Sequence, residues 1–230
     1  MTSKLIARSA LMILVLGAFA ATLSAQQLEL YPNAGGFLPH RVNFGDMRSH
    51  LEEEGIYGLK GGVFLNPNVQ LEGSFGYINH FEPRDTPAPI DSSFGIMPRT
   101  IYGLLFDING AWNFRQRQFF GKTVTPYVAA GGGGLTAEVR HTDAALLAGS
   151  FYTTDPSTGA PVLSNSRTIT LHDGATFFAV NYGGGIKALN LWGPMGFRAD
   201  VRGRTLPNFY GKEMSWPEIT GGLTFAWGER

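Results

Sequence analysis

The stretch from Phe197 to Arg204, FRADVRGR, carries a charged side chain at every second position. In an extended strand this spacing places Arg198, Asp200, Arg202 and Arg204 on one face. An unpaired ion in an apolar core costs several kcal/mol, whereas oppositely charged neighbours on adjacent strands can pair. The stretch therefore indicates either a solvated face or an internal network of salt bridges.

The remaining candidates for chemistry form no recognisable catalytic motif. A G-x-S-x-G nucleophile elbow is missing from the sequence. His141 with Asp143, or His172 with Asp173, could support acid–base chemistry, but the interpretation as polar loop residues is favoured. We therefore expect no enzymatic activity, no cofactor and no metal site. The five histidines are His40, His50, His80, His141 and His172.

Two glycine-rich segments resemble nucleotide-binding loops only superficially. The GKT at Gly121–Thr123 lacks the first glycine of a P-loop, because Gln116 occupies that position. The run Gly131–Gly134 falls inside an expected strand, where it favours close backbone approach or a bend of the sheet. Neither segment predicts nucleotide binding.

Composition excludes several classes of protein. The 230 residues include 18 basic and 18 acidic side chains, a balance that argues against a nucleic-acid partner. The chain has no cysteine, which excludes disulfides and thiolate zinc sites. With 31 glycines among 230 residues, the glycine content is well above the average usage of about 7%. The glycines follow no fixed period. The glycines must therefore belong to folded segments.

The N-terminus has the features of a secretory signal peptide. Two basic residues precede the uncharged run Leu11–Ala21, and small residues follow at Ser24 and Ala25. The run is shorter than the roughly 20 apolar residues that span a bilayer as a helix. We expect cleavage near Ala25, so that residues 1–25 are removed and residues 26–230 form one exported domain.

Beyond the signal peptide, the dominant pattern is an alternation of apolar and polar residues with a period of two. This pattern is typical of β-strands whose two faces meet different environments. The expected strands are 28–37, 56–65, 69–81, 101–114, 124–139, 175–189, 195–204 and 217–227.

The connections between these strands alternate between short and long. The long ones are expected at 38–55, 82–100, 140–174 and 205–216. In an antiparallel meander every second connection lies at the same end, so one end carries all the long loops. Bacterial outer-membrane barrels have this asymmetry, with short periplasmic turns and longer extracellular loops. A soluble up-and-down barrel of eight strands is not excluded by the loops alone.

The two faces of the expected strands favour the membrane barrel. One face is rich in large apolar residues and the other in small and polar ones, and eight strands enclose a lumen just wide enough for side chains. Bulky aromatics therefore suit a lipid-facing exterior, and closure avoids unpaired strand edges in hydrocarbon. The outward aromatics form two expected girdles. They are Trp112, Phe114, Tyr127, Phe197, Phe225 and Trp227 toward the short turns, and Tyr57, Tyr77, Phe81, Tyr102 and Phe178 toward the long loops.

The same alternation places ten charged side chains inside the barrel. The tight turn at residues 66–68 should set Glu72 opposite Gly62 and within reach of Lys60. We expect salt bridges among these charges to plug the lumen, with a polar lining for a narrow, water-filled pore as the alternative. The expected lumen charges are Lys60, Glu72, Asp107, Glu138, Lys187, Arg198, Asp200, Arg202, Arg204 and Glu218.

The segments LELYPNAGGF, VTPYVAAGGGG and YGGGIKALNLWGPMGFRADVRGR, together with the last strand, resemble the OmpA-like family of small outer-membrane barrels, which includes OmpW-like proteins. In the last strand, Thr220, Gly222, Phe225 and Trp227 follow the spacing of the signal read by the outer-membrane assembly machinery. The chain continues through Gly228–Arg230, whereas the family often ends on the aromatic residue.

The resemblance implies an all-β fold, an eight-stranded antiparallel up-and-down transmembrane β-barrel. It also implies contact with outer-membrane lipid, lipopolysaccharide and the assembly machinery. We expect a protein of the outer membrane of a diderm bacterium, with both termini periplasmic, a structural or surface role, and long loops that meet an extracellular partner. The second hypothesis, implied by the OmpW resemblance, is a narrow channel for small or hydrophobic solutes, and the third is a lipid-modifying enzyme.

Overall fold

The computed structural model describes residues 27–39, 41–44, 47–50, 53–81, 101–139, 144–154, 157–158 and 161–228. The expected signal peptide at 1–25 and the expected loop at 82–100 lie outside these residues. The strands are β1 (Leu28–Phe37), β2 (Arg41–Phe44), β3 (Met47–His50), β4 (Glu54–Phe64), β5 (Val69–Ile78), β6 (Ile101–Asn113), β7 (Arg117–Phe119), β8 (Lys122–Val139), β9 (Ala144–Thr154), β10 (Pro161–His172), β11 (Ala175–Trp192), β12 (Met195–Phe209) and β13 (Lys212–Trp227).

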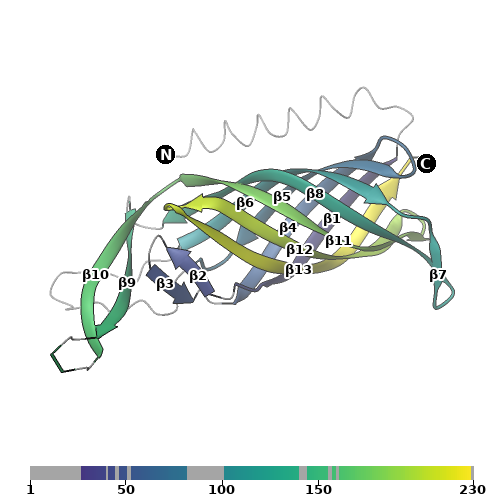
Figure 1. Ribbon diagram of the computed structural model, residues 1–230. Coiled ribbons are helices and arrows are strands. Elements are labelled where there is room, and N and C mark those ends of the chain that lie inside the picture. The colour runs from purple at the N-terminus through teal and green to yellow at the C-terminus, as the bar shows by residue number, and fades with distance from the viewer. Residues whose placement is uncertain are drawn as a thin grey trace.

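Eight of these strands close into an antiparallel barrel (Figure 1). Their order around the wall is β8, β11, β12, β13, β1, β4, β5 and β6, and β6 pairs back with β8. Each strand pairs mainly with its neighbours in the sequence, as in an up-and-down meander, and β1 and β13 join the two ends of the chain. The predicted fold class is confirmed. In the described part of the chain, no helix is long and apolar enough to cross a membrane.

Tight turns close the end of the barrel at which the described chain begins with β1 and ends with β13. These two ends of the described chain lie side by side and are here called the chain termini. Between β4 and β5, the side-chain Oδ1 of Asn66 accepts hydrogen bonds from the backbone N–H groups of Asn68 (2.9 Å) and Val69 (2.8 Å). The register then sets Glu72 opposite Gly62, as predicted. The connection from β6 to β8 forms a second hairpin, in which β7 pairs with the start of β8.

At the opposite end, the prediction of a long loop at 205–216 is wrong. The strands β12 and β13 continue through most of this segment and meet at a two-residue turn, Tyr210 and Gly211. Both turn residues have positive φ angles, 53° and 85°, which suit a tight hairpin. The ladder shifts between Leu206 and Phe209, so Pro207, which has no N–H to donate, falls in an irregularity rather than a regular ladder.

Two further hairpins lie in two of the other three regions expected to be long loops. The strands β2 and β3 pair within 38–55, and β9 and β10 pair within 140–174. Figure 1 shows the β9–β10 hairpin extending beyond the barrel wall, at the end opposite the C-terminus. In the described residues, the expected asymmetry between the ends of the barrel therefore takes the form of hairpins.

The glycine run in β8 permits a close approach of β6. A Cβ atom on Gly133 would lie 1.8 Å from the carbonyl oxygen of Phe106, and one on Gly131 would lie 2.1 Å from that of Ile108. Both distances are far below van der Waals contact, so these positions require glycine. The prediction of close backbone approach at Gly131–Gly134 is confirmed at these two positions.

Large apolar side chains cover the outer wall, but the predicted outward orientation is wrong for two of the aromatic residues. Tyr127 is 2% exposed and faces the lumen, because β8 turns Thr125, Tyr127 and Ala129 inward. Phe81 leaves the alternation after β5 and folds over the barrel end, where its N–H donates to the carbonyl of Ile101 (2.8 Å). Exposed members of the two girdles are Trp112, Phe114, Phe197 and Trp227 at the short-turn end and Tyr57 and Phe178 at the other end.

Candidate functional site: the barrel lumen

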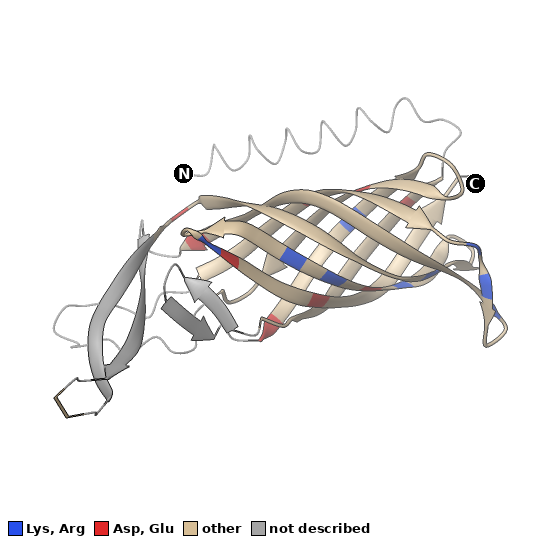
Figure 2. Cartoon of the chain, viewed as in Figure 1, with Lys and Arg blue, Asp and Glu red and all other residues tan. Residues whose placement is uncertain are grey.

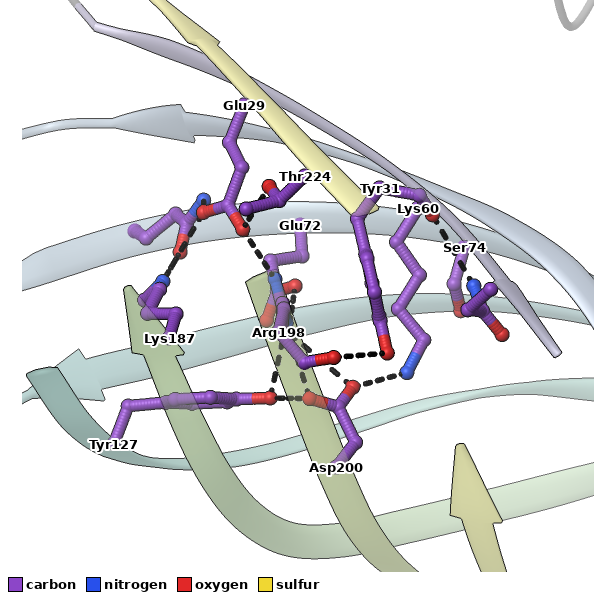
Figure 3. A network of polar contacts seen from close by, with 12 residues as sticks. Glu29, Tyr31, Lys60, Glu72, Ser74, Tyr127, Lys187, Arg198, Asp200 and Thr224 are labelled. Carbon is purple, nitrogen blue, oxygen red and sulfur yellow. Dashed lines mark hydrogen bonds and ion pairs between the residues drawn. The ribbon is translucent and has the colours of Figure 1, made fainter. Parts of the chain in front are cut away.

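Arg198 is the centre of an ion-pair network in the lumen (Figure 3). It lies near the start of β12, and so in the half of the lumen nearest the chain termini. Its guanidinium contacts three carboxylates that come from three different strands. Nη1 lies 3.1 Å from Oε1 of Glu29, Nη2 lies 2.6 Å from Oε2 of Glu72, and Nε lies 3.0 Å from Oδ1 of Asp200. The planar fork of arginine can serve several carboxylates at once, which a lysine ammonium would not do in this geometry.

Two tyrosine rings enclose the same guanidinium. Its carbon atom lies 4.9 Å from the ring centre of Tyr31 and 4.6 Å from that of Tyr127, both within cation–π range. Arg198 Nε also donates to the Tyr127 hydroxyl (3.1 Å), and that hydroxyl donates to Asp200. The rings therefore fix the position of the cation as well as excluding water from it.

Glu29 on β1 accepts hydrogen bonds from four donors. Besides Arg198, they are Lys187 Nζ (3.1 Å), Gln70 Nε2 (2.8 Å) and Thr224 Oγ1 (3.1 Å). Lys187 donates in addition to Gln70 Oε1 (2.6 Å). A buried carboxylate needs this degree of satisfaction, because its desolvation is costly.

Asp200 and Glu72 extend the network across the lumen. Asp200 accepts from Lys60, as Figure 3 shows, and lies 3.7 Å from Arg202 Nε. Arg202 Nη2 also lies 3.3 Å from Glu72 Oε1. Arg198 and Arg202 thus both contact Glu72, whereas Lys60, which was expected within reach of Glu72, pairs with Asp200.

Arg204 forms a second ion-pair group, further from the termini. It holds Asp107 through two contacts, Nη1–Oδ1 (2.5 Å) and Nη2–Oδ2 (2.9 Å), and its Nε lies 2.8 Å from Glu218 Oε1. Ser74 Oγ donates to Asp107 (2.9 Å), and Trp216 Nε1 donates to Glu218 (2.9 Å). Trp216 thereby links the charged part of the lumen to the apolar cluster above it.

Above the charges, the lumen is filled by an apolar cluster, here called the apolar plug. Aromatic contacts run through it, with Phe37 5.3 Å from Trp216 and 6.0 Å from Phe81 between ring centres. The alternation in the sequence predicted a polar lumen and did not predict this layer, although Leu105 and Ile101 share the face of Asp107. The apolar plug comprises Phe37, Ile56, Ile78, Phe81, Ile101, Leu105, Leu135, Ala137, Val139, Leu171, Ala179, Leu206, Phe209, Met214 and Trp216.

The structure places the predicted lumen charges inside the barrel except for Glu138. In β8 the buried positions are Ala137 and Val139, so Glu138 is only partly buried and lies opposite Tyr102 on the outer face. Glu29, which was not among the predicted lumen charges, lies inside instead. The alternation in LELYPN, with Glu29, Tyr31 and Asn33 on one face, would have identified it.

The lumen charges are balanced. Among the side chains that the structure describes, the five basic ones are Lys60, Lys187, Arg198, Arg202 and Arg204, and the five acidic ones are Glu29, Glu72, Asp107, Asp200 and Glu218. Because each of them contacts at least one opposite charge, the network needs no external counter-ion.

The described histidines lie away from this network. His80 Nδ1 is 3.6 Å from Glu54 Oε2, and His172 is exposed beside Asp173, whose Oδ1 accepts the N–H of Val139 (2.9 Å). His141 lies outside the described residues. Among the residues that the structure describes, no group of three or more histidine, cysteine or acidic side chains is placed to hold a metal ion.

The proposed assembly signal lies along β13. Thr220 faces the lumen, and a Cβ atom on Gly222 would lie 2.3 Å from the carbonyl oxygen of Pro32 on β1. The rings of Phe225 and Trp227 stack 6.0 Å apart near the end of the strand. The glycine thus has a structural role at the seam that closes the barrel, and reading by the assembly machinery stays a prediction.

The chain has the fold of other small, closed β-barrels. A crystal structure of Neisserial surface protein A (NspA) superimposes with a TM-score of 0.52 and 10% sequence identity, over 86% of this chain and 96% of that one. Two further barrels align with lower scores. Ail of Yersinia pestis, solved in complex with the heparin analogue sucrose octasulfate, has a TM-score of 0.43 and 14% identity over 87% of this chain and 99% of that one. The outer membrane protein AlkL in lipid bilayers has 0.42 and 12% identity over 89% and 91%.

No protein-family model and no curated protein sequence matches the chain. The likeness is therefore one of fold, and it places the chain in the structural class of small eight-stranded β-barrels. The finer resemblance to OmpA-like or OmpW-like proteins stays a hypothesis.

Proposed function

We propose that this chain is an integral outer-membrane β-barrel with a closed lumen and a structural or surface-interaction role. The periplasmic end is the one with the tight turns and both termini, and the hairpins of the opposite end meet the exterior. The protein carries no catalytic site in this proposal.

The distribution of side chains on the outer wall supports membrane insertion. Ile108, Phe178 and Val201 are 68%, 63% and 56% exposed, although each belongs to a barrel strand. A groove of about 500 Å³ on this wall has Trp112, Val128 and Tyr182 among its lining residues. Meanwhile the paired charges of the same strands point inward. An apolar exterior around a charged interior is the reverse of the arrangement in a soluble protein and is unfavourable in water. It suits hydrocarbon, because an apolar exterior has no desolvation cost there.

The single observation that carries the closed-lumen proposal is that two different layers block the same channel. Near the termini, Arg198 and its tyrosine and carboxylate partners fill the lumen from opposite walls. Further along, the apolar plug packs side chains from β1, β4, β5, β6, β8, β11, β12 and β13 against one another. A hydrated ion would have to break a balanced ion-pair network and then cross an apolar layer.

Planar-bilayer conductance of the purified protein tests this proposal. We expect no steady current from the native chain, and none from an Arg117→Gln control, whose side chain lies outside the lumen. Steady currents that change when Arg202 is replaced by Gln would contradict the closed lumen and support the narrow channel. Heat-modifiable gel mobility in the outer-membrane fraction tests insertion separately, and recovery as a soluble periplasmic protein would contradict it.

One observation favours the narrow channel as a second candidate. Asn109 is buried between the two ion-pair groups, and within the described part of the chain neither of its amide atoms has a hydrogen-bond partner, nor does Nδ2 of Asn181. Buried amides usually find a partner, and a hydrated segment of lumen would supply one. The apolar plug would still have to open for a solute to pass.

The non-enzymatic part of the proposal has its own measurement. The lumen carboxylates are held in ion pairs, and neither His80 nor His172, the histidines whose side chains the structure describes, pairs with them, so they offer no free general base. We expect the lipid A of cells that produce the protein to match that of cells that lack it. A modified lipid A that depends on the protein would support the lipid-modifying enzyme instead.

A further inference from the structure

Residues 114–124 form a hairpin that extends beyond the barrel wall at the end with the chain termini. In its ladder Arg117 pairs with Val124 and Phe119 with Lys122, with Phe120 and Gly121 at the tip. Figure 1 shows this hairpin, labelled β7, projecting past the barrel end and bending away from the line of the strands. Every side chain from 114 to 123 is exposed. The hairpin therefore contributes nothing to the filling of the lumen.

The hairpin is cationic. It carries Arg115, Arg117 and Lys122, and the sequence has no acidic residue between Asn113 and Thr125. Figure 2 shows the basic positions of the hairpin in blue. Within the described residues none of the three cations takes part in an ion pair, in contrast to the lumen, where every charge is paired. Three unpaired cations on one small hairpin attract an anionic surface.

The tip of the hairpin is aromatic. Phe119 and Phe120 are 57% and 90% exposed, and their rings contact each other edge to face with centres 4.6 Å apart. Two adjacent phenylalanines in water are unfavourable, and the barrel fold does not require them. They are the kind of side chain that an apolar or interfacial environment accepts.

The β12–β13 turn has an aromatic residue in the same backbone conformation as Phe120, but that residue is packed against other rings. Phe120 and Tyr210 both have left-handed backbone conformations, with φ angles of 47° and 53°, which non-glycine residues rarely adopt. Tyr210 packs against Phe177 (5.4 Å between ring centres) and Phe209 (5.0 Å), so its contacts compensate for the strain. Phe120 has the same strain, is 90% exposed, and makes its one ring contact among the described residues with Phe119. An aromatic held there at a cost indicates a contact outside the chain.

We propose that the hairpin of residues 114–124 docks on the phospholipid surface of the membrane leaflet at the end of the barrel with the chain termini. Arg115, Arg117 and Lys122 bind headgroup phosphates, and Phe119 and Phe120 enter the interfacial layer below them. A lipid surface fits better than a soluble polyanion, because the aromatic pair needs an apolar environment and the barrel holds the hairpin next to the bilayer. This inference rests on the membrane insertion in the proposed function, which makes the leaflet periplasmic.

The absence of cysteine from the sequence permits a direct test. A Phe120→Cys variant of the full chain takes a single nitroxide label, and Pro67→Cys in the exposed turn at the same end is the matched control. Both are reconstituted into vesicles of phosphatidylglycerol or of phosphatidylcholine. In phosphatidylglycerol we expect the label at 120 to collide more with oxygen than with a water-soluble nickel chelate, and the label at 67 to show the reverse.

Charge removal gives the second readout. Replacement of Arg115, Arg117 and Lys122 by Gln in the labelled variant should lower the ratio of docked to undocked hairpin about a hundredfold, at about fivefold for each cation near an anionic surface. The native hairpin should likewise dock less in phosphatidylcholine than in phosphatidylglycerol. Equal docking in the two lipids would overturn the role of the cations.

Other outcomes separate this inference from the proposed function. Labels at 120 and 67 that are equally accessible to the nickel chelate in both lipids would overturn docking, whether or not the barrel conducts. A label at 120 that is accessible in vesicles but protected in isolated outer membranes would overturn the lipid surface in favour of a protein partner. A chain that inserts into neither vesicle would overturn the membrane barrel itself, and this inference with it.

Discussion

Replacement of Arg198 by Met tests whether the lumen network is buried or hydrated. The substitution keeps an unbranched, flexible side chain but removes a cation that contacts Glu29, Glu72 and Asp200 at 2.6–3.1 Å. The lumen then holds four basic and five acidic side chains in place of five of each. One negative charge is left without compensation in a part of the lumen where Arg198 itself is only 3% exposed.

The magnitude follows from the geometry. Two unit charges 4 Å apart attract by about 4 kcal/mol at an effective dielectric constant of about 20. Removal of one partner from a buried pair typically destabilises a protein by about 3–5 kcal/mol, because the other charge stays behind unpaired. Loss of the contacts with the rings of Tyr31 and Tyr127 adds to this cost. We therefore expect the free energy of unfolding to fall by at least about 3–5 kcal/mol.

The measurement is urea unfolding of the barrel in lipid vesicles, followed by tryptophan fluorescence and by the heat-modifiable gel band. Arg198→Lys keeps the charge without the fork and should be intermediate. Arg117→Met, at an exposed position, should have no measurable effect. A loss below about 1 kcal/mol for Arg198→Met would refute the reasoning, because it would mean that water solvates the remaining carboxylates and that the lumen is hydrated.

Two further predictions concern barrel closure and assembly. Gly133→Val should abolish the folded, heat-modifiable band, because its Cβ would lie 1.8 Å from a carbonyl oxygen of the neighbouring strand, whereas Gly110→Ala, with no atom within 4 Å of the new Cβ, should fold normally. Both variants folding alike would contradict the close approach of β6 and β8. Trp227→Ala should slow assembly into vesicles that contain the purified assembly machinery more than Trp112→Ala, since both side chains are about half exposed but only Trp227 belongs to the proposed signal. Equal rates would contradict that signal.

The sequence predicted the barrel because the alternation of apolar and polar residues is visible in each strand separately. The positions of Asp107 on β6 and of Arg198 to Arg204 on β12 follow from it, since a strand turns every second side chain to the same face. The alternation failed in β8, where Tyr127 and Glu138 were both assigned to the wrong face. One cause explains both errors. Between them lies VAAGGGG, which has no contrast of polarity, and a phase error of one residue exchanges the two faces of a strand.

Partners within the lumen could not be predicted from the alternation. It places Lys60 and Glu72 inside, but whether Lys60 meets Glu72 or Asp200 depends on how far β4 is offset from β12 around the closed wall. The apolar plug was missed for a related reason. A strand that is polar inside at one end and apolar inside at the other, as β6 is with Asp107 and Leu105, gives a mixed signal when its inner face is read as a whole.

The sequence by itself determined the class of fold, the inward direction of most charges and the cationic, aromatic composition of residues 114–124. These properties depend on residues within one strand or one turn, where local geometry is regular. The tertiary structure decided that the charges balance in pairs around Arg198, that an apolar layer lies above them, and that Phe120 stands exposed in a strained turn while Tyr210 is packed. Those properties depend on the register and closure of eight strands, which bring together residues that lie far apart in the chain.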